Sequence, residues 1–484
     1  MKIPSYKTVT LFVLFFSILF TGCKKDDPTK NDISGKTEAP VITQKVNTFI
    51  KDAMTNFYLW TSFLPNIDTK YETDSKAYFD KLLYKDDKWS YITDNIAEWE
   101  NSLQGIEKTF GYSLQFGRFV DAGGIATGEY FAIVEYVYPN TPATRAGIER
   151  GTIITQVNGS NITKDNYTSL LSGERITITK GILSTSGISN SETDSIKSEV
   201  LNLDPVILYK VIETEGHKIG YLFYNQFIAS YNSSLEVAFN YFKTNQITDL
   251  VIDLRYNLGG EQPAAVYLCS SIAPRSDVDN IKTLMTFQWN DRMMKYWASN
   301  NAPEQITQPF NNMVPVKLDL NNVTILTSHG TASASEFTIT GLKPYMNVVL
   351  VGDTTYGKYT GSWTLKPEHL YSDPSIYADF KNWGIQPIVV RYANSQGVTN
   401  FVHGFPPDFL VADELLPAQP LGDLSEPLLK KAVENITGVP ILATKSALPK
   451  FNFKVFDRGF SEFDHVKRNL QMDIKKDFSK GKLE

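Results

Sequence analysis

The chain has 484 residues, of which 42% are hydrophobic and 21% charged, and its formal net charge is −6. This length exceeds the size at which one hydrophobic core keeps growing, so two or three domains are expected. The mild negative charge and the lack of a basic stripe argue against nucleic acid as a partner. Two cysteines cannot form a disulfide framework, and the five scattered histidines have no metal-ligand spacing, so neither a metal nor another cofactor is predicted.

The N-terminal segment, 1–22, predicts a secretory signal. Lys2 and Lys7 precede an apolar run from Val9 to Phe20, which is too short to span a bilayer as a helix. Thr21-Gly22-Cys23 then resembles a bacterial lipobox, although Phe20 stands where leucine is usual. The resemblance implies lipidation of Cys23 and anchoring in the outer membrane of a bacterial cell envelope, on either face. The polar residues that follow predict a flexible tether over 23–40. The alternative is an ordinary signal peptide followed by an incidental cysteine.

Residues 41–108 predict a small helical domain. Apolar side chains recur there at helical spacing and form two amphipathic stripes. The first stripe consists of Val41, Val46, Phe49, Ile50, Ala53, Phe57, Leu59 and Trp60, and the second begins with Tyr78, Leu82 and Leu83.

Residues 109–205 predict a β domain. The run Tyr130–Val134 is rich in strand-forming residues, and the Pro139–Pro142 segment ends it. Ala143–Ile148 allows one helical turn that stops at a glycine, and Thr152–Val157 returns to strand before an Asn-Gly turn.

This order resembles a PDZ domain of the bacterial protease type. The segments 138–147 and 151–159 carry the resemblance, with Phe110-Gly111-Tyr112-Ser113-Leu114 at the start of the domain. PDZ domains bind extended peptide ends by strand addition, and loop amides hold the terminal carboxylate. The resemblance implies that the loop 110–114 captures peptides. The alternative is a small β domain whose glycines are only structural.

Residues 206–438 predict an α/β domain, and no role is predicted for the tail, 439–484. Three short apolar runs, Leu250–Leu254, Val323–Leu326 and Val348–Val351, are typical of buried strands. Each run is followed by a loop that carries polar residues. If the second and third runs belong to one β-α-β crossover, they are parallel and their loops meet at one edge of the sheet.

These two loops carry Ser333 and Lys358, 25 positions apart. A serine hydroxyl is a weak nucleophile until a base removes its proton, and a lysine acts as that base only when it is uncharged. Burial can lower the pKa of a lysine from its reference value near 10.4 to about 8. At that pKa enough of the amine is uncharged at neutral pH for it to act as the base. A developing oxyanion requires two N–H donors, for which Ala334 and one glycine of the Gly259-Gly260 pair are the candidates.

Other interpretations of these residues remain open. Ser333-x-x-Glu336 is a capping box, which needs no catalysis, and Ser335 is a competing nucleophile. Gly352 to Lys358 approaches a phosphate-binding loop but is followed by Tyr359 instead of serine or threonine, so no nucleotide is expected. A Ser-His-Asp triad that uses Ser333 with His329 or another histidine is a further alternative.

Three segments together resemble the signatures of the carboxyl-terminal processing, or tail-specific, serine peptidases: Asp253–Gly260, Thr331–Glu336 and Thr355–Lys358. The resemblance covers about residues 41–438. It implies an α/β fold in which a crotonase/ClpP-like catalytic domain follows an N-terminal helical segment and a PDZ-like β domain. It also implies that Ser333, not Ser335, is the nucleophile.

The family resemblance further implies cleavage of exported proteins near their carboxyl ends, without ATP or metal. The partners are then peptides or proteins, while the oligomeric state is not predicted. Many members place a glutamine that orients the lysine where this chain has Ser362, and Tyr256 and Leu258 also depart from the usual pattern. Ser362 is the candidate orienter here. The rival interpretation is a non-catalytic, peptide-binding surface lipoprotein.

Overall fold

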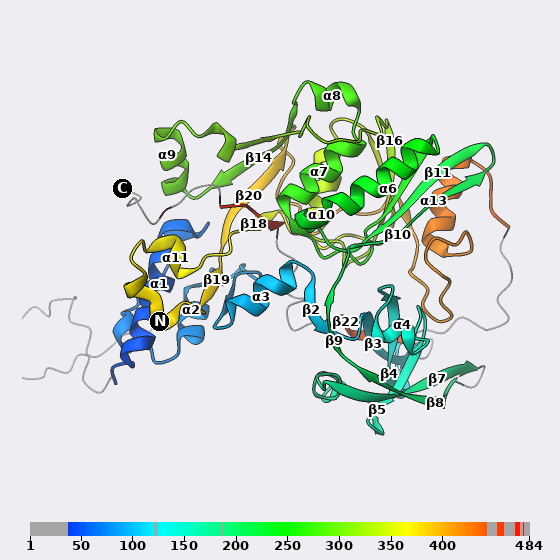
Figure 1. Cartoon of the computed structure of the whole chain (residues 1–484), viewed down its shortest axis with the longest axis horizontal. Coiled ribbons are helices and arrows are strands. Elements are labelled where there is room, and N and C mark those ends of the chain that lie inside the picture. The colour runs from blue at the N-terminus through cyan, green and yellow to red at the C-terminus, as the bar shows by residue number, and fades with distance from the viewer. Residues whose placement is uncertain are drawn as a thin grey trace, which may run out of the picture.

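The computed structural model describes residues 37–442 except 121–122 and 185–186, together with 453–458, 470–474 and 478. The predicted signal peptide, Cys23 and most of the tether lie outside the described residues. A helical layer, a β domain and a larger α/β domain follow one another along the chain (Figure 1). Within the described ranges, every helix is too short or too polar to cross a membrane.

The N-terminal layer is built on three helices, α1 (Val41–Phe57), α2 (Ser75–Leu82) and α3 (Ile96–Leu103). The predicted apolar stripe extended to Trp60, but α1 ends at Phe57. The chain turns there because Tyr58 is extended and the Leu59 N–H donates to the carbonyl of Ile388 at 2.8 Å. Short 3₁₀ turns, Thr61–Phe63 and Thr69–Tyr71, and a strand, β1 (Tyr91–Thr93), complete the layer.

The β domain is an antiparallel sheet in the order β22-β3-β4-β5-β7-β8. Its strands are β3 (Tyr112–Val120), β4 (Ala126–Val137), β5 (Ile153–Val157), β7 (Arg175–Ser184), β8 (Gly187–Lys197) and β22 (Phe453–Arg458), with β6 (Ser160–Asn161) beside β5. Its helices are α4 (Pro142–Arg145) and α5 (Tyr167–Leu171). Asn158 and Gly159 have positive φ, as the predicted turn requires. The ribbon of β2 (Ile106–Thr109) and β9 (Glu199–Asn202) connects this domain to the rest.

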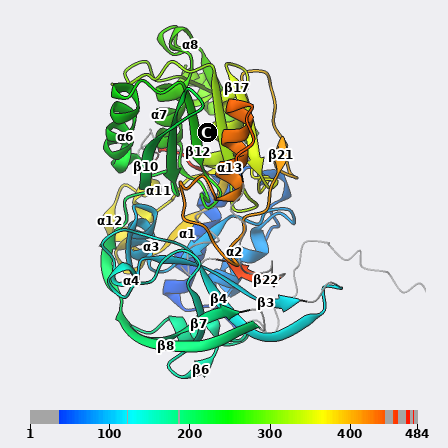
Figure 2. The ribbon, with the colours of Figure 1, turned by 90° about the vertical axis from the view of Figure 1, so that its right-hand side faces the viewer.

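The α/β domain contains a sheet in the order β10-β11-β12-β16-β17-β21, parallel from β11 onward. Its strands are β10 (Val206–Thr214), β11 (His217–Tyr224), β12 (Asp249–Asp253), β16 (Asn322–Thr327), β17 (Asn347–Gly352) and β21 (Phe409–Leu410). The three apolar runs of the sequence are therefore strands, as predicted, and the structure pairs them side by side in parallel. Helices α6 (Asn232–Thr244) and α7 (Gln262–Ile272) lie on one side of this sheet, and α13 (Pro427–Thr437) lies on the other (Figure 2). The helix α10 (Ala334–Leu342) packs on the same side as α6 and α7.

A second sheet has the order β13-β23-β18-β20-β14-β15. Its strands are β13 (Gly260–Glu261), β23 (Leu470–Gln471), β18 (Thr360–Ser362), β20 (Ile388–Asn394), β14 (Thr283–Trp289) and β15 (Thr307–Pro309), while β19 (Gly384–Gln386) pairs with β1. The helix α10 packs between the two sheets, since it contacts β17 on one side and β14 and β20 on the other. The domain also contains shorter helices and 3₁₀ turns: α8 (Arg275–Asp279), α9 (Asp291–Ser299), α11 (Pro367–Leu370), α12 (Pro374–Tyr377) and the 3₁₀ turns Ala229–Tyr231, Pro303–Gln305 and Ala378–Phe380.

The core supports the predicted class of mixed α/β protein with N-terminal helices and a separate β domain. The main hydrophobic cluster joins α1, both sheets and the helices between them, whereas the β domain has a cluster of its own. Cys269 lies in α7 and is fully buried, and this burial raises the pKa of its thiol to about 12. It is a packing residue.

Candidate active site

Two loops of the parallel sheet meet at one edge. The strands β16 and β17 pair in parallel, with Leu326 opposite Val351, and α10 crosses between them. The predicted crossover is thus confirmed, and the segments 328–333 and 353–358 leave the sheet at the same edge. The loop after β12 joins them there, since the Leu254 N–H donates to the carbonyl of Leu326 at 3.0 Å.

Ser333 lies at the N-cap of α10 in a strained conformation. Its φ is 58° and its ψ is −107°, a region that costs a non-glycine residue about 1–3 kcal/mol. The residue is fully buried, and its hydroxyl makes no hydrogen bond with any residue that the structure describes. Ser333 and Glu336 have the arrangement of a capping box, in which Glu336 accepts the Ser333 N–H at 2.9 Å, but the serine hydroxyl forms no cap hydrogen bond.

Glu336 connects the two loops. Its Oε2 accepts the N–H groups of Ser333 at 2.9 Å and Lys358 at 2.8 Å. Its Oε1 accepts the Thr355 hydroxyl and the Gly357 N–H, both at 2.6 Å. Burial raises the pKa of Glu336 to about 7, although these four hydrogen bonds act in the opposite direction. Both carboxylate oxygens hold the lysine loop in place, because each accepts at least one hydrogen bond from the segment 355–358.

Tyr392 of β20 makes a second connection between the same two residues. Its hydroxyl donates to the carbonyl of Lys358 at 2.7 Å and is 3.1 Å from the carbonyl of Ser333. The tyrosine is fully buried, and burial raises the pKa of its hydroxyl well above the usual value, so it stays a donor. Ser333 and Lys358 are therefore fixed to each other through their N–H groups by Glu336 and through their carbonyls by Tyr392.

The Lys358 side chain is buried under the N-terminal layer. None of its surface is exposed, and its Nζ lies 5.1 Å from the centroid of the Trp89 ring. Burial favours the uncharged amine, whereas an aromatic face favours the charged one. Trp89 belongs to the segment just before β1, so the helical layer forms one wall of the site.

The candidate oxyanion donors lie next to Ser333. A Cβ added at Gly259 would be 2.8 Å from the Ser333 Cβ and 3.1 Å from the Ala334 nitrogen. Ala334 is the first residue of α10, and an amide at this position has no partner inside the helix. In this conformation the Gly259 N–H donates to Oδ1 of Asn257 at 2.9 Å, while Gly260 packs against the carbonyl of Phe227. The assignment of Gly259, Gly260 and Ala334 as donors stays a prediction.

The residues behind the competing interpretations have structural roles. The Ser335 hydroxyl donates to the carbonyl of Asn257 at 3.1 Å, which supports the loop after β12. The His329 ring packs 5.4 Å from the Tyr356 ring, and no described histidine hydrogen-bonds Ser333. The Gly357 N–H points to a carboxylate, which is the wrong charge for a phosphate cradle. Among the described residues, no three His, Cys, Asp or Glu side chains gather as metal ligands.

Ser362 and Gly357, which lie on either side of Lys358 in the sequence, both contact neighbouring segments of the chain. The Ser362 hydroxyl donates to the carbonyl of Leu470 at 3.4 Å, so its role as lysine orienter stays a prediction. Gly357 lies against the neighbouring loop: a Cβ there would be 2.5 Å from the carbonyl of Val402, and its φ of 97° also favours glycine.

A buried charge network supports the loop after β12. Arg255 forms a bidentate pair with Asp253, at 2.9 and 2.8 Å, and a second pair with Glu426, at 2.6 and 2.8 Å. The Tyr221 hydroxyl also donates to Asp253 at 2.7 Å. The arginine and both carboxylates are completely buried. The Asp-Leu-Arg motif was visible in the sequence, but its partner Glu426 lies in a distant part of the chain.

Tyr256, a departure from the family pattern, lies at the contact with the β domain. Arg150 donates to the Tyr256 hydroxyl at 2.6 Å and to Asp413 at 2.7 Å, and the tyrosine hydroxyl donates to the same carboxylate. Burial opposes ionisation of Asp413, but Arg150 and Arg255 together hold its pKa well below the usual range. The β domain is thus bound directly to a residue three positions before Gly259.

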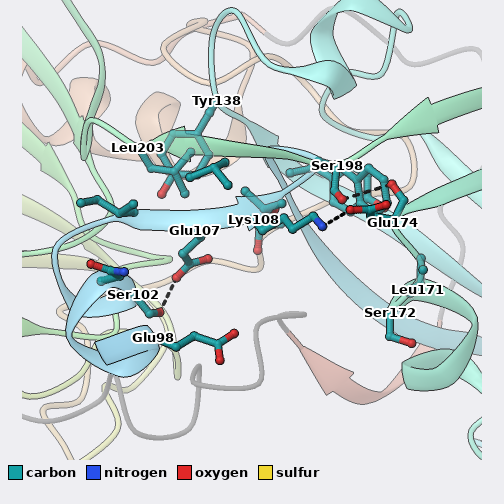
Figure 3. A pocket seen from close by; sticks show the side chains of 18 of the residues that line it. Glu98, Ser102, Glu107, Lys108, Tyr138, Leu171, Ser172, Glu174, Ser198 and Leu203 are labelled. Atoms are coloured by element: carbon teal, nitrogen blue, oxygen red, sulfur yellow. Dashed lines mark hydrogen bonds and ion pairs between the residues drawn. The ribbon is translucent and has the colours of Figure 1, made fainter. Parts of the chain in front are cut away.

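The loop 110–114 opens on a cavity of about 630 Å³ between the β domain and the connecting ribbon (Figure 3). Phe110, Tyr112 and Ser113 contribute to its lining, and Lys108 pairs with Glu174 across it. The Tyr112 hydroxyl is buried without a hydrogen bond to a described residue. The other two predicted residues, Gly111 and Leu114, are absent from this lining.

Gly111 and Leu114 of the loop 110–114 pack inside the β domain. A Cβ at Gly111 would overlap the Thr141 side chain, and Leu114 lies fully inside the core of the β domain. Their part in peptide binding stays a prediction.

Three segments of the chain match known family profiles. Residues 45–91 match the Peptidase S41 N-terminal domain, residues 133–179 a PDZ domain, and residues 218–411 Peptidase family S41. The chain is therefore similar to the S41 serine peptidases, and the relatives that it matches are carboxyl-terminal processing peptidases.

The relatives have low but extended similarity. The chain is 25% identical over 292 residues to the chloroplastic C-terminal processing peptidase of Tetradesmus obliquus, which covers 58% of this chain and 56% of the relative. It is 25% identical over 223 residues to the carboxy-terminal processing protease of Bacillus subtilis, covering 46% and 43%. The chain therefore spans about half the length of these relatives.

A putative S41 protease from Bacteroides fragilis has the same fold. Its crystal structure is 26% identical, with a TM-score of 0.67 over 81% of this chain and 97% of the other. With the PDZ match, this confirms the predicted fold: an α/β peptidase domain of the S41 type with an N-terminal helical segment and a PDZ domain.

Proposed function

We propose that the protein is a serine endopeptidase in which Ser333 attacks the substrate carbonyl and Lys358 is the general base. One observation carries the proposal: Glu336 and Tyr392 hold the two residues side by side, and the Ser333 hydroxyl is buried without a hydrogen bond to any described residue. A hydroxyl with no structural task, in a strained conformation at a helix start, is typical of a nucleophile.

The proposed reaction begins when uncharged Lys358 removes the proton from the Ser333 hydroxyl. The serine oxygen then forms a bond to the carbonyl carbon, and the Ala334 N–H with one glycine N–H stabilises the oxyanion. The lysine returns its proton to the leaving amine as the C–N bond breaks. A water molecule, deprotonated by the same lysine, then hydrolyses the ester and restores the serine.

The proposed substrates are exported proteins cut near their carboxyl ends. The similarity to carboxyl-terminal processing peptidases and the PDZ match support this proposal. The PDZ domain would bind an extended chain end, with the cavity beside Phe110, Tyr112 and Ser113 as the place for its terminal residue.

The decisive experiment measures cleavage of fluorescein-labelled casein by the purified chain. Ser333→Ala and Lys358→Met should each lower kcat by about 10³-fold or more. Ser335→Ala is the matched comparison, and it should retain turnover, because its hydroxyl only supports the carbonyl of Asn257. Equal activity of Ser333→Ala and the wild type, or no hydrolysis by any folded form, would exclude the peptidase and favour a non-catalytic peptide-binding lipoprotein.

We further propose that the protein is exported and anchored to the outer membrane through a lipidated Cys23. The lysines and apolar run before Thr21-Gly22-Cys23 support this proposal. Metabolic labelling with a radioactive fatty acid tests it: wild type should incorporate label and sediment with membranes, and Cys23→Ala should do neither. Label retained by Cys23→Ala would refute the anchor.

A further inference from the structure

The strand β22 joins the PDZ sheet from a remote part of the chain. It pairs antiparallel with β3 as the edge strand of the sheet, with Phe453 opposite Phe119 and Arg458 opposite Gln115. The whole peptidase domain lies between these paired positions in the sequence. The other strands of this sheet all lie between residues 112 and 197, so β22 is an addition to a domain that is otherwise contiguous.

β22 lies in the position and direction that a PDZ ligand takes. Peptides bind these domains by adding a strand to an exposed edge. The carboxyl end of β22, at Arg458, lies nearest to the loop 110–114, which is the direction a captured chain end requires. Gly117 allows the close approach, because a Cβ there would be 2.9 Å from the carbonyl of Lys454.

Phe456 packs against aromatic side chains of β3, β4 and α5. Its ring centroid lies 6.0 Å from Phe116 on β3, 5.4 Å from Tyr130 on β4 and 5.4 Å from Tyr167 on α5. The next side chain, Asp457, accepts a hydrogen bond from the Tyr167 hydroxyl. The strand bulges at Phe456, since the pairing register shifts between Val455 and Asp457.

Arg458 extends this contact to the loops of the active site. Its guanidinium pairs with the buried Glu135 of β4 at 2.5 Å and stacks on the Tyr256 ring at 4.6 Å. It also lies 3.3 Å from the Ser328 hydroxyl, at the start of the loop that leads to Ser333. A Cβ at Gly330 would overlap this guanidinium, so the loop is shaped around it.

We propose that residues 453–458 are an intramolecular ligand of the PDZ groove, which a substrate must displace. The groove then selects extended peptides with an aromatic side chain, followed by an acidic one, in the places of Phe456 and Asp457. Displacement also removes Arg458 from the Ser328 loop. The inference rests on the proposed peptide-binding role of the PDZ domain and not on catalysis by Ser333.

A tethered ligand has a quantitative consequence. A segment attached to the same chain competes at an effective concentration in the millimolar range. A peptide of the same sequence added from solution therefore binds poorly while the segment is docked. Weakening the docked segment, without changing the groove, makes the same peptide bind more tightly. An integral strand of the domain gives the opposite result, because losing it damages the groove.

The test uses the full chain carrying Ser333→Ala, so that no peptide is cleaved. The probe is acetylated and amidated Phe-Lys-Val-Phe-Asp-Arg with a fluorophore, and its Kd is measured by anisotropy. Adding Phe456→Ala should tighten binding at least about tenfold, since the tethered competitor is weakened. Adding Tyr167→Ala as well should abolish the gain, because the groove is damaged. The matched control, Lys454→Ala, changes an exposed side chain on β22 and should leave the Kd unchanged.

Two results overturn the proposal. One is an equal Kd with and without Phe456→Ala while both proteins melt cooperatively. The other is tight binding that survives Tyr167→Ala. If Phe456→Ala does not fold, Asp457→Ala replaces it, and losing one hydrogen bond to Tyr167 should tighten the Kd about threefold or more; an unchanged Kd again overturns the proposal. The experiment measures peptide binding and not turnover. A negative result would therefore refute the intramolecular ligand without bearing on the peptidase proposal.

Discussion

The backbone amides of Ser333 and Lys358 donate to one and the same carboxylate oxygen, Oε2 of Glu336. The two residues are 25 positions apart, on loops that follow two different strands. Because a single oxygen receives both N–H groups, any shift of one loop against the other breaks a hydrogen bond in a fully buried place. The distance between nucleophile and base is thus controlled by a side chain that need not touch the substrate.

Glu336→Gln should disable the enzyme. A glutamine has one acceptor oxygen, so its NH₂ group would face N–H donors from one loop or the other. Buried donors left without acceptors cost about 1–3 kcal/mol each, and the resulting misplacement lowers kcat about 100-fold. Steady-state kinetics on casein and a urea unfolding curve check both effects. Glu304→Gln, on an exposed 3₁₀ turn, is the control and should match wild type in both assays.

The same carboxyl group should make stability depend on pH. Its pKa rises from about 4.5 in the unfolded chain to about 7 in the fold, so between these values the folded protein holds a proton that the unfolded one has lost. Stability from this group is therefore present at low pH and is lost as pH rises through 7. The free energy of unfolding of wild type minus that of Glu336→Gln should fall by about 2.5 kcal/mol between pH 5 and pH 8. A pH-independent difference would show that Glu336 stays ionised.

Tyr392→Phe should slow the chemical step without weakening substrate binding. The variant keeps the ring in the core but leaves the carbonyls of Ser333 and Lys358 without their common donor. The lost hydrogen bonds stabilise the placement of the two residues in the transition state by about 1 kcal/mol. Their loss should therefore lower kcat by about fivefold to tenfold and leave KM unchanged. Tyr359→Phe provides the comparison, since that tyrosine packs by its ring against Phe401. A matching rise in KM would mean that Tyr392 lies in the substrate path.

Gly259→Ala should damage the site through crowding more than through backbone strain. Its added Cβ would lie 2.8 Å from that of Ser333, and its φ is 115°. Displacing the nucleophile lowers kcat about 100-fold. Gly397→Ala separates the two effects, because Gly397 has a φ of 81° with nothing within 4 Å of the added Cβ. Its kcat should equal that of wild type, and equal losses for both variants would contradict the crowding argument.

The sequence was sufficient for the parts of the site that rest on local patterns. Short apolar runs identified β12, β16 and β17, and the spacing between Ser333 and Lys358 correctly implied a parallel crossover. The capping pattern also located the start of α10 and singled out Glu336. Its second pair of hydrogen bonds, to Thr355 and Gly357, depends on how two loops meet in space, and no local pattern encodes that.

The remaining elements were missed for the same reason. Tyr392 is one aromatic residue in an apolar strand, and nothing in its neighbourhood distinguishes it from a core residue. Phe453, Val455 and the lysine between them alternate as a strand does, which was the available signal for β22. Its partner strand β3 lies near the other end of the chain, and pairing at that distance is decided by the folded surface. The contact of Trp89 with Lys358 likewise joins two separate domains.

Arg255→Met should destabilise the fold more than an exposed arginine variant does. The methionine fills a similar volume but leaves Asp253 and Glu426 buried without this cation. Breaking a buried pair from one side costs about 3–5 kcal/mol, because the remaining charges are uncompensated. Arg275→Met removes an exposed pair with Asp279 and should cost less than about 1 kcal/mol. Urea unfolding of both variants at pH 7 makes the comparison.

The pH dependence of Arg255→Met identifies the cause of its instability. Since two carboxyl groups then lack the arginine, lowering the pH to 5 should restore part of the lost stability, because protonation removes the buried charge. A loss that is the same at both pH values would point to packing instead of charge. A variant that loses no stability at pH 7 would show that the network is not needed to hold the loop that carries Gly259.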